Sequence, residues 1–302
     1  MKRRDFIQKT AAGSALVMGG LSLSSFVAPE VKKLTILHTN DVHSHIDPFP
    51  IDDPKYANKG GVSRRATLID QVRREEENVL LLDAGDIFQG TPYFNYYGGE
   101  LEMKLMSMLK YDLGTLGNHD FDNGIDGFYK QMPHAKFDFV SANYDFKNTV
   151  LDGIVKPYKI FEKGGLKIGI FGLGVELHGL VDKKLYKETV YNNPIDVAQD
   201  MSRILKLDHK CDLVICLSHL GFIYDNDNQK PSDLMLGRTT KNIDAIIGGH
   251  THTFLTKPYI QKNLDGKDVL INQVGAFGIN VGRLDFTFEN GGKSGSGKTI
   301  IV

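Results

Sequence analysis

Apolar runs typical of β-strands are followed, one after another along this chain, by Asp, Asn or His residues. Leu34–His38 precedes Asp41 and His43, and Val79–Leu82 precedes Asp86. The remaining runs, with the polar residues that follow each, are Asp112–Leu116 with Asn118 and His119, Leu213–Leu217 with His219, and Ile243–Ile247 with His250 and His252. Ligands of open α/β sheets collect outside the carboxyl ends of strands. The pattern therefore predicts a polar site where several strands end.

Two of these segments carry a pair of donors separated by one residue. In an extended segment, alternate residues face the same side, so Asp41 and His43 can offer a carboxylate and an imidazole to one cation. His250 and His252 repeat this arrangement. They follow Gly248-Gly249, which permits a tight turn toward the site. The spacing within each of these two pairs predicts that both bind a metal ion.

Asp86 is expected to bridge two cations, because a carboxylate has two oxygens and can hold one cation on each. Asn118 adds an amide oxygen and His219 another imidazole. A lone His after a strand is more often only hydrogen-bonded, and a lone Asp more often caps a helix or turn. Their recurrence in order along one chain favours two divalent metal ions. Mixed nitrogen and oxygen ligands without thiolate suit Mn, Zn, Fe or Co alike.

Helical and strand-like patterns alternate along the chain. Apolar residues recur at helical spacing from Val62 to Val72 and from Leu101 to Met108. A third helix is expected to begin at Pro194, with Asn193 as its cap. The run at Lys167–Leu173, like that at 213–217, predicts strands buried on both faces. A single layered α/β domain over residues 31–302 follows from this alternation.

The N-terminal residues 1–28 are typical of a twin-arginine signal peptide. Arg3-Arg4 is followed by Phe6 and Ile7, and then by a weakly hydrophobic stretch rich in small residues. The protein is therefore expected in the periplasm. The alternative is a membrane-anchored form, because Pro29 is a poor residue to follow a cleavage site at Ala28.

The sequence gives little support for binding of polymeric nucleic acid, for a disulfide bond or for a nucleotide-binding P-loop. A net charge of −1 gives no basic surface for polymeric nucleic acid. Cys211 and Cys216 are expected to be unpaired core residues, since positions an odd number apart on a strand face opposite sides. Gly292–Thr299 reads GKSGSGKT and matches the P-loop pattern. Too few residues follow it to form the helix of a P-loop, so we expect a flexible turn leading to a short terminal strand.

The segments HTNDVHSH, GGVSRRATLI, LLDAGDIFQGTPYF, TLGNHDFD, SANYDF, LSHLG and GGHTH together resemble the calcineurin-like metallophosphoesterase superfamily, in its exported bacterial 5′-nucleotidase and UDP-sugar hydrolase branch. The resemblance implies an α/β fold, a four-layer sandwich of two mixed β-sheets flanked by helices. By position, it assigns the first metal to Asp41, His43, Asp86 and His252. It assigns the second metal to Asp86, Asn118, His219 and His250.

The resemblance gives His119 and Asp122 a catalytic role, in transition-state stabilisation and leaving-group protonation. It implies hydrolysis of nucleotide phosphate monoesters by a metal-activated hydroxide. Nucleotide-sugar pyrophosphatase, cyclic-nucleotide phosphodiesterase and a metal-containing binding protein are the alternatives. A binding protein would have no need of the His119–Asp122 pair.

Relatives in this branch carry a second, C-terminal domain whose aromatic residues hold the nucleoside, and this sequence shows no such domain. Either a separate polypeptide supplies that domain, or the substrates are a broader class of small phosphate esters. Tyr93, Phe94, Tyr96 and Tyr97 follow the Asp86 segment. They could form an aromatic wall near the site, and local packing of a loop is the alternative.

Overall fold

The computed structural model describes residues 31–302, and the predicted signal peptide lies outside them. Lys32–Val302 form one compact unit. Its helices are α2 (Val62–Glu75), α3 (Pro92–Tyr97), α4 (Glu100–Met108), η1 (His119–Phe121), α5 (Gly124–Gln131), η2 (Met132–His134), α6 (Lys183–Tyr186), α7 (Pro194–Arg203), η3 (Ile204–Asp208) and α8 (Asp233–Thr239).

Two six-stranded mixed sheets form the centre of the unit. The first has the order β14-β13-β1-β2-β3-β4, and its strands are β1 (Lys32–Thr39), β2 (Val79–Asp83), β3 (Leu113–Thr115), β4 (Asp138–Val140), β13 (Asn280–Glu289) and β14 (Gly292–Ile301). The second has the order β11-β12-β10-β9-β7-β6, and its strands are β6 (Tyr158–Lys163), β7 (Leu166–Gly174), β9 (Leu213–His219), β10 (Ala245–Gly248), β11 (Tyr259–Lys262) and β12 (Asp268–Asn272). A small third sheet pairs β5 (Tyr144–Asp145) with β8 (Val190–Tyr191).

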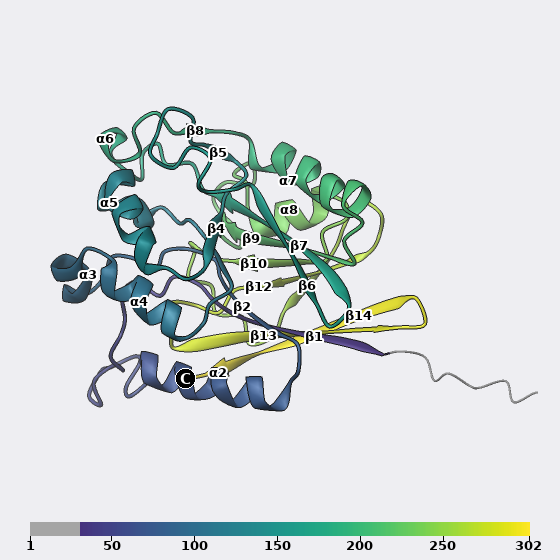
Figure 1. Ribbon diagram of the computed structural model, residues 1–302, viewed down its shortest axis with the longest axis horizontal. Helices are drawn as coiled ribbons and strands as arrows, with labels where there is room; N and C mark the ends of the chain where they lie inside the picture. The colour runs from purple at the N-terminus through teal and green to yellow at the C-terminus, as the bar shows by residue number, and fades with distance from the viewer. Residues whose placement is uncertain (1–30) are drawn as a thin grey trace, which may run out of the picture. The chain divides into compact units, whose positions relative to one another are not determined.

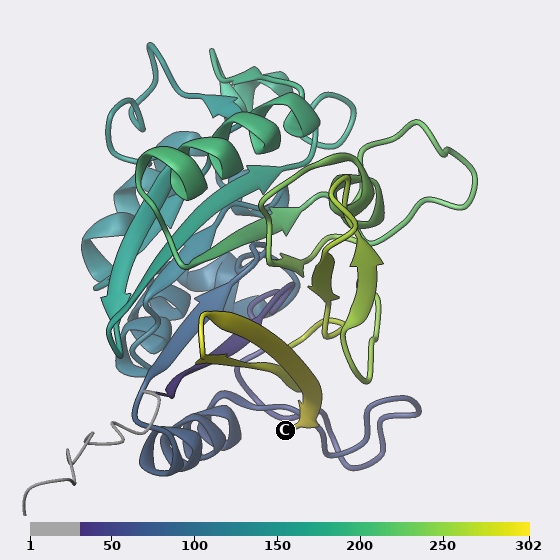
Figure 2. The same cartoon turned by 90° about the vertical axis from the view of Figure 1, so that its right-hand side faces the viewer.

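Three hydrophobic cores produce four layers (Figures 1 and 2). Between the sheets, Leu34 and Leu80 belong to one buried cluster with Ile168 and Ile215. Helices α2, α4 and α5 cover the outer face of the first sheet, and α7 and α8 cover that of the second. The strands β7 and β9 are buried along nearly their whole length, as their continuous apolar runs predict. The structure confirms the predicted sandwich of two mixed sheets flanked by helices.

The predicted helices are present, and the local chemistry explains where they begin. Helix α7 begins at Pro194, and the side chain of Asn193 accepts hydrogen bonds from the backbone N–H groups of Ile195 (2.9 Å) and Asp196 (3.4 Å). This cap satisfies donors that a helix N-terminus leaves without intrahelical partners. The predicted helices near residues 62 and 101 are α2 and α4.

The prediction for residues 292–299 was wrong. These residues are part of β14, which pairs antiparallel with β13 from Asn280↔Ile301 to Glu289↔Gly292 (Figure 2). The turn consists of Asn290 and Gly291, both with positive φ, of 52° and 74°. Asn-Gly is the favoured sequence for a two-residue turn of this kind. The segment is therefore a Gly/Ser-rich edge strand, and the interpretation that it is no P-loop is unchanged.

Two smaller findings complete the fold. Cys211 and Cys216 are free and buried, as predicted. Among residues 31–302, no helix is both long enough and apolar enough to cross a lipid bilayer.

Candidate metal centre

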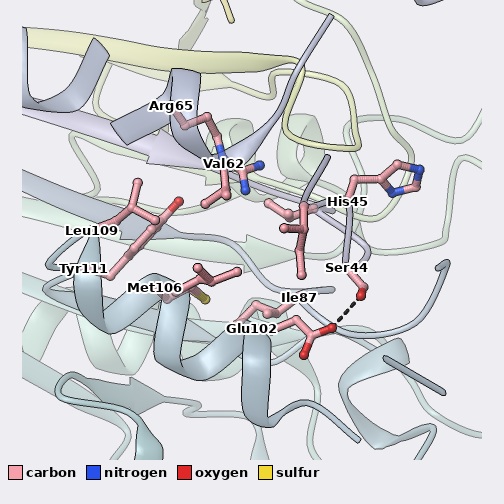
Figure 3. A pocket seen from close by; sticks show the side chains of 12 residues that line it. Ser44, His45, Val62, Arg65, Ile87, Glu102, Met106, Leu109 and Tyr111 are labelled. Atoms are coloured by element: carbon pink, nitrogen blue, oxygen red, sulfur yellow. Dashed lines mark hydrogen bonds between the residues drawn. The ribbon is translucent and has the colours of Figure 1, made fainter. Parts of the chain in front are cut away.

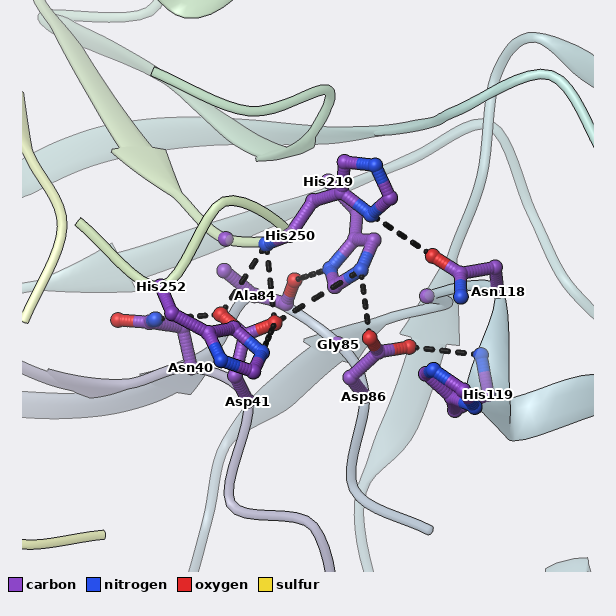
Figure 4. A network of polar contacts seen from close by, with 12 residues as sticks. Asn40, Asp41, Ala84, Gly85, Asp86, Asn118, His119, His219, His250 and His252 are labelled. Carbon is purple, nitrogen blue, oxygen red and sulfur yellow. Dashed lines mark hydrogen bonds and ion pairs between the residues drawn. The ribbon is translucent and has the colours of Figure 1, made fainter. Parts of the chain in front are cut away.

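The ends of parallel strands from both sheets bring the predicted site residues together (Figure 4). Strands β1, β2 and β3 run parallel in the first sheet, as do β9 and β10 in the second. The loops that leave these strands at their carboxyl ends carry the predicted ligands Asp41, His43, Asp86, Asn118, His250 and His252, and His219 is the last residue of β9.

Asp41, His43 and His252 form the first candidate metal cluster. One ligand atom from each lies within 4.8 Å of those of the other two. The Nε2 atoms of His43 and His252 are 3.0 Å apart, and Asp41 Oδ1 is 3.4 Å from His252 Nε2. His43 Nδ1 lies 3.3 Å from the carbonyl oxygen of Phe88. A hydrogen bond from Nδ1 to a carbonyl leaves the Nε2 lone pair free for a cation.

Asp86, His219 and His250 form the second cluster, with the same spread of ligand atoms. His219 Nδ1 lies 2.7 Å from the carbonyl oxygen of Ala84, so its Nε2 is again the atom free to bind a cation. The side-chain oxygen of Asn118 lies 2.8 Å from His250 Nδ1. This donor set fits the borderline divalent ions that the sequence predicts.

Asp86 belongs to the second cluster, and one of its carboxylate oxygens also faces the first cluster. Its Oδ2 is 3.0 Å from Nε2 of His219 and 3.8 Å from Nε2 of His43. Its Oδ1 instead accepts a hydrogen bond of 2.8 Å from the backbone N–H of His119. We expected one cation on each oxygen, whereas this geometry turns the single oxygen Oδ2 toward both clusters.

The backbone of the site lies largely in the left-handed region. Positive φ occurs at the candidate ligands Asp41 (50°), His43 (48°), Asp86 (56°), His250 (76°) and His252 (51°). Such a conformation is uncommon for residues other than Gly, and it persists only where the surrounding structure enforces it. These sharp turns at the strand ends bring the ligands into one place.

The electrostatics of the site suit positive charge. Burial opposes ionisation of Asp86, but His219 and His43 hold its pKa below the usual range. Burial lowers the pKa of His219, and the carboxylates of Asp86 and Asp41 overcome this effect and raise it to about 10. A divalent cation would replace the proton on His219. We therefore expect metal binding to weaken at low pH, where protons compete for the same atoms.

His119 and Asp122 form a pair at the edge of the clusters. His119 Nδ1 lies 2.7 Å from Asp122 Oδ2, and the side chains are 38% and 28% exposed. The hydrogen bond to Asp122 raises the pKa of His119 above its ordinary value, although burial lowers it. The His119 ring lies edge-on to His43, with ring centroids 5.2 Å apart. His119 is thus close to the clusters while its ring remains accessible.

The part of the chain that carries this arrangement matches a known protein family. The calcineurin-like phosphoesterase family matches residues 34–254, which include both clusters and the His119–Asp122 pair. The chain belongs to this family. Its residues are 36% identical to the snake venom 5′-nucleotidase of Naja atra, over 89% of this chain and 53% of that protein.

Two solved structures of similar proteins agree with the fold of this phosphoesterase. The 5′-nucleotidase precursor of Thermus thermophilus is 34% identical with a TM-score of 0.80, over 89% of this chain and 54% of that one. The NAD nucleotidase of Haemophilus influenzae is 29% identical with a TM-score of 0.78, over 90% and 57%. The phosphoesterase chain thus spans about half the length of the relatives it matches.

Asp120 supports the candidate metal centre, a role that was not predicted from the sequence. Its carboxylate is 1% exposed and accepts hydrogen bonds from four backbone N–H groups, those of Asp86 (3.0 Å), Ile87 (2.9 Å), Phe88 (3.2 Å) and Gly117 (2.8 Å). Burial and the neighbouring Asp86 raise its pKa to about 7. Asp120 thereby joins the loop carrying Asp86 to the loop carrying Asn118. No local sequence signal marks this role, because three of the four donors are more than 30 residues away in the sequence.

A second support lies beneath the His43–Ser44 turn (Figure 3). The Ser44 hydroxyl donates a hydrogen bond to the buried carboxylate of Glu102 on α4. Next to this contact is a cavity of about 20 Å³, whose lining includes Arg65 and Tyr111. Ser44 has a φ of 57°, so Glu102 helps to hold a left-handed turn beside a candidate ligand.

Several other residues lie outside the two clusters. Phe94 is buried and packs against Phe88 with ring centroids 5.3 Å apart, and Tyr96 is 82% exposed. Of the two alternatives for these aromatic residues, local packing therefore describes Phe94. Asp47 accepts a hydrogen bond of 2.6 Å from the Tyr93 hydroxyl. His45 adjoins the first cluster through a 3.0 Å contact with the His43 carbonyl.

Replacing Gly117 with Ala is expected to weaken metal binding about 10- to 100-fold, as is typical when the support of a ligand is lost. An added methyl group would overlap the carboxylate of Asp86 and its backbone nitrogen, so the carboxylate must move. Titration of the apoprotein with Mn²⁺ or Zn²⁺ measures the change. Gly292→Ala is the control, because its methyl group would meet only the Glu289 carbonyl, at 3.3 Å. Unchanged affinity in the Gly117 variant would contradict this role.

Proposed function

We propose that this chain is an exported two-metal phosphohydrolase that cleaves phosphate monoesters of nucleotides. The observation that supports it most is the position of Asp86 Oδ2, which faces Nε2 of His43 in one cluster and Nε2 of His219 in the other. In the proposal, Asp41, His43, Asp86 and His252 hold one ion. Asp86, Asn118, His219 and His250 hold the second. Two divalent ions in such a site supply Lewis acidity toward the phosphoryl oxygens and a water of lowered pKa.

The His119–Asp122 pair supplies the proton chemistry in this proposal. Asp122 accepts a hydrogen bond from His119 Nδ1, which leaves Nε2 directed away from Asp122 and available to the substrate. The raised pKa of His119 favours the imidazolium, which stabilises negative charge on the phosphoryl group or protonates the departing alkoxide. A protein that only bound phosphate esters would need the metal ligands and not this pair.

Similar proteins support nucleotides as the substrate class. The relative from Naja atra is named a 5′-nucleotidase and that from Haemophilus influenzae an NAD nucleotidase. The name NAD nucleotidase makes cleavage of a nucleotide pyrophosphate the second candidate function for this chain. Export is proposed from the sequence of residues 1–28 alone.

Hydrolysis of AMP to adenosine and phosphate is the expected result when purified protein is supplied with Mn²⁺, Zn²⁺ or Co²⁺. Chelation should abolish turnover, and adding the metal back should restore it. AMP, UDP-glucose, NAD, 2′,3′-cyclic AMP and an aryl phosphate would be assayed side by side. Turnover of UDP-glucose or NAD at the pyrophosphate, with AMP left intact, would replace the proposed function with the second candidate. Cleavage of cyclic AMP alone would establish a phosphodiesterase.

A further inference from the structure

A connected group of aromatic side chains lies beside the first metal cluster, and nothing in the proposed function uses it. We call Phe49, Tyr56, Phe254 and Phe277 the aromatic shelf. Phe277 begins the shelf at the site, with its ring centroid 5.6 Å from that of His252 and 6.0 Å from that of His43. The shelf is therefore continuous with the side chains proposed to hold the first ion.

The shelf extends from Phe277 toward solvent. Phe49 and Tyr56 each lie 5.9 Å from Phe277, and Phe254 stacks on Tyr56 at 6.2 Å with 23° between the ring planes. Phe254 is 45% exposed and the other three are partly exposed. Partly exposed aromatic rings that adjoin a polar, metal-binding cluster mark a surface suited to an apolar, planar group.

The backbone holds Phe277 in its place against the site. Phe277 has a φ of 63°, which is an outlier for a bulky side chain. Its N–H donates a hydrogen bond of 2.7 Å to the carbonyl oxygen of Asp41. Gly275 and Gly278, with φ of 83° and 59°, provide the turns on either side. A strained residue tied directly to a candidate ligand indicates that the position of this ring matters to the site.

We propose that the aromatic shelf binds the base of the nucleotide by stacking, while the phosphate lies at the metal centre. This inference rests on the proposed function and adds the part of the molecule that recognises the leaving group. One sugar separates the phosphate from the base, so the base must contact a surface a short distance from the ions. Tyr56 lies next to Phe277, and Phe254 lies next to Tyr56. Stacking on these rings accepts any base because every base has an aromatic face.

A purely structural role for the shelf makes a different prediction. If the rings only stabilise the loop that carries Phe49 and Tyr56, truncating one of them would affect substrates with and without a base equally. AMP and ribose 5-phosphate share the phosphate and the sugar and differ in the base. The kcat/KM for AMP divided by the kcat/KM for ribose 5-phosphate therefore reports on stacking. This ratio is insensitive to a general loosening of the loop.

The test compares the wild-type protein with Phe254→Ala, Phe254→Tyr and the control Tyr259→Ala, each loaded with Mn²⁺. Tyr259 lies on β11 of the second sheet and is 46% exposed, much like Phe254. Its ring packs on Phe222, outside the aromatic shelf. We expect the wild type to prefer AMP over ribose 5-phosphate. Phe254→Ala should reduce that preference by roughly tenfold, which is within the range for one base–aromatic contact. Phe254→Tyr should keep the preference, as should Tyr259→Ala.

Equal kcat/KM for AMP and ribose 5-phosphate in the wild type would overturn the inference. So would a Phe254→Ala variant in which both values fall together. If the wild type hydrolyses neither compound with any metal, the proposed function itself fails. The shelf is then tested by calorimetric binding of AMP to wild type and Phe254→Ala, and equal affinity, or no binding to either, counts against it.

Discussion

Replacing Asp86 with Asn is expected to abolish turnover and to reduce the metal content from two ions per chain to one or none. Asn keeps the shape of the side chain and can still accept the hydrogen bond from the His119 N–H through Oδ1. It loses the negative charge that lies between two like-charged cations, so the ions would repel each other without compensation. Metal analysis of the dialysed variant and its AMP hydrolysis are the two measurements.

The matched control for this change is Asp47→Asn. Asp47 is exposed and accepts a hydrogen bond only from the Tyr93 hydroxyl among the described contacts. We expect the Asp47 variant to hold two ions and to turn over normally. An Asp86 variant that also kept two ions and full activity would show that Asp86 does not bridge the clusters.

Replacing His119 with Ala is expected to reduce kcat about 10²- to 10⁴-fold while two ions remain bound. The range is that of general acid–base catalysis by one positioned side chain. The metal content should not change, because the contact of His119 with Asp86 is made by its backbone N–H, which Ala retains. Metal analysis and steady-state kinetics on the same preparation separate the two effects.

Two further variants sharpen this test. His134→Ala removes a ring of comparable exposure, 34% against 38%, and should leave kcat unchanged. Asp122→Asn removes the carboxylate charge and so weakens the hydrogen bond that raises the pKa of His119. The imidazolium then loses its proton at lower pH, so the alkaline fall in kcat/KM should move to lower pH. Loss of metal together with activity in His119→Ala would show that His119 supports the ions and is not the acid.

The positions of the candidate ligands could be predicted from the sequence because short-range patterns determine where strands end. Buried parallel strands have continuous apolar runs, so the ends of β1, β2, β9 and β10 were visible, and the carboxyl ends of parallel strands meet at one edge. The start of α7 was visible for a similarly local reason, since Asn193 caps the helix that begins at Pro194 through the N–H groups of Ile195 and Asp196.

Features that depend on tertiary contacts were not visible. Residues 292–301 have a Gly/Ser-rich composition that disfavours strands, and only pairing with β13 makes them one. Asp120 accepts a hydrogen bond from the backbone N–H of Asp86, 34 residues away in the sequence. The aromatic shelf joins Phe49 and Tyr56 to Phe254 and Phe277, which are distant in sequence. No local pattern in a single sequence marks such a contact.

Anomalous diffraction from crystals of the protein loaded with Mn²⁺ or Zn²⁺ tests the two-metal proposal most directly. Two peaks roughly 3.5–4 Å apart are expected. One should lie among Asp41, His43 and His252, the other among Asn118, His219 and His250, and Asp86 Oδ2 should contact both. A single peak, or a pair of peaks of which neither is in contact with Asp86, would contradict the account.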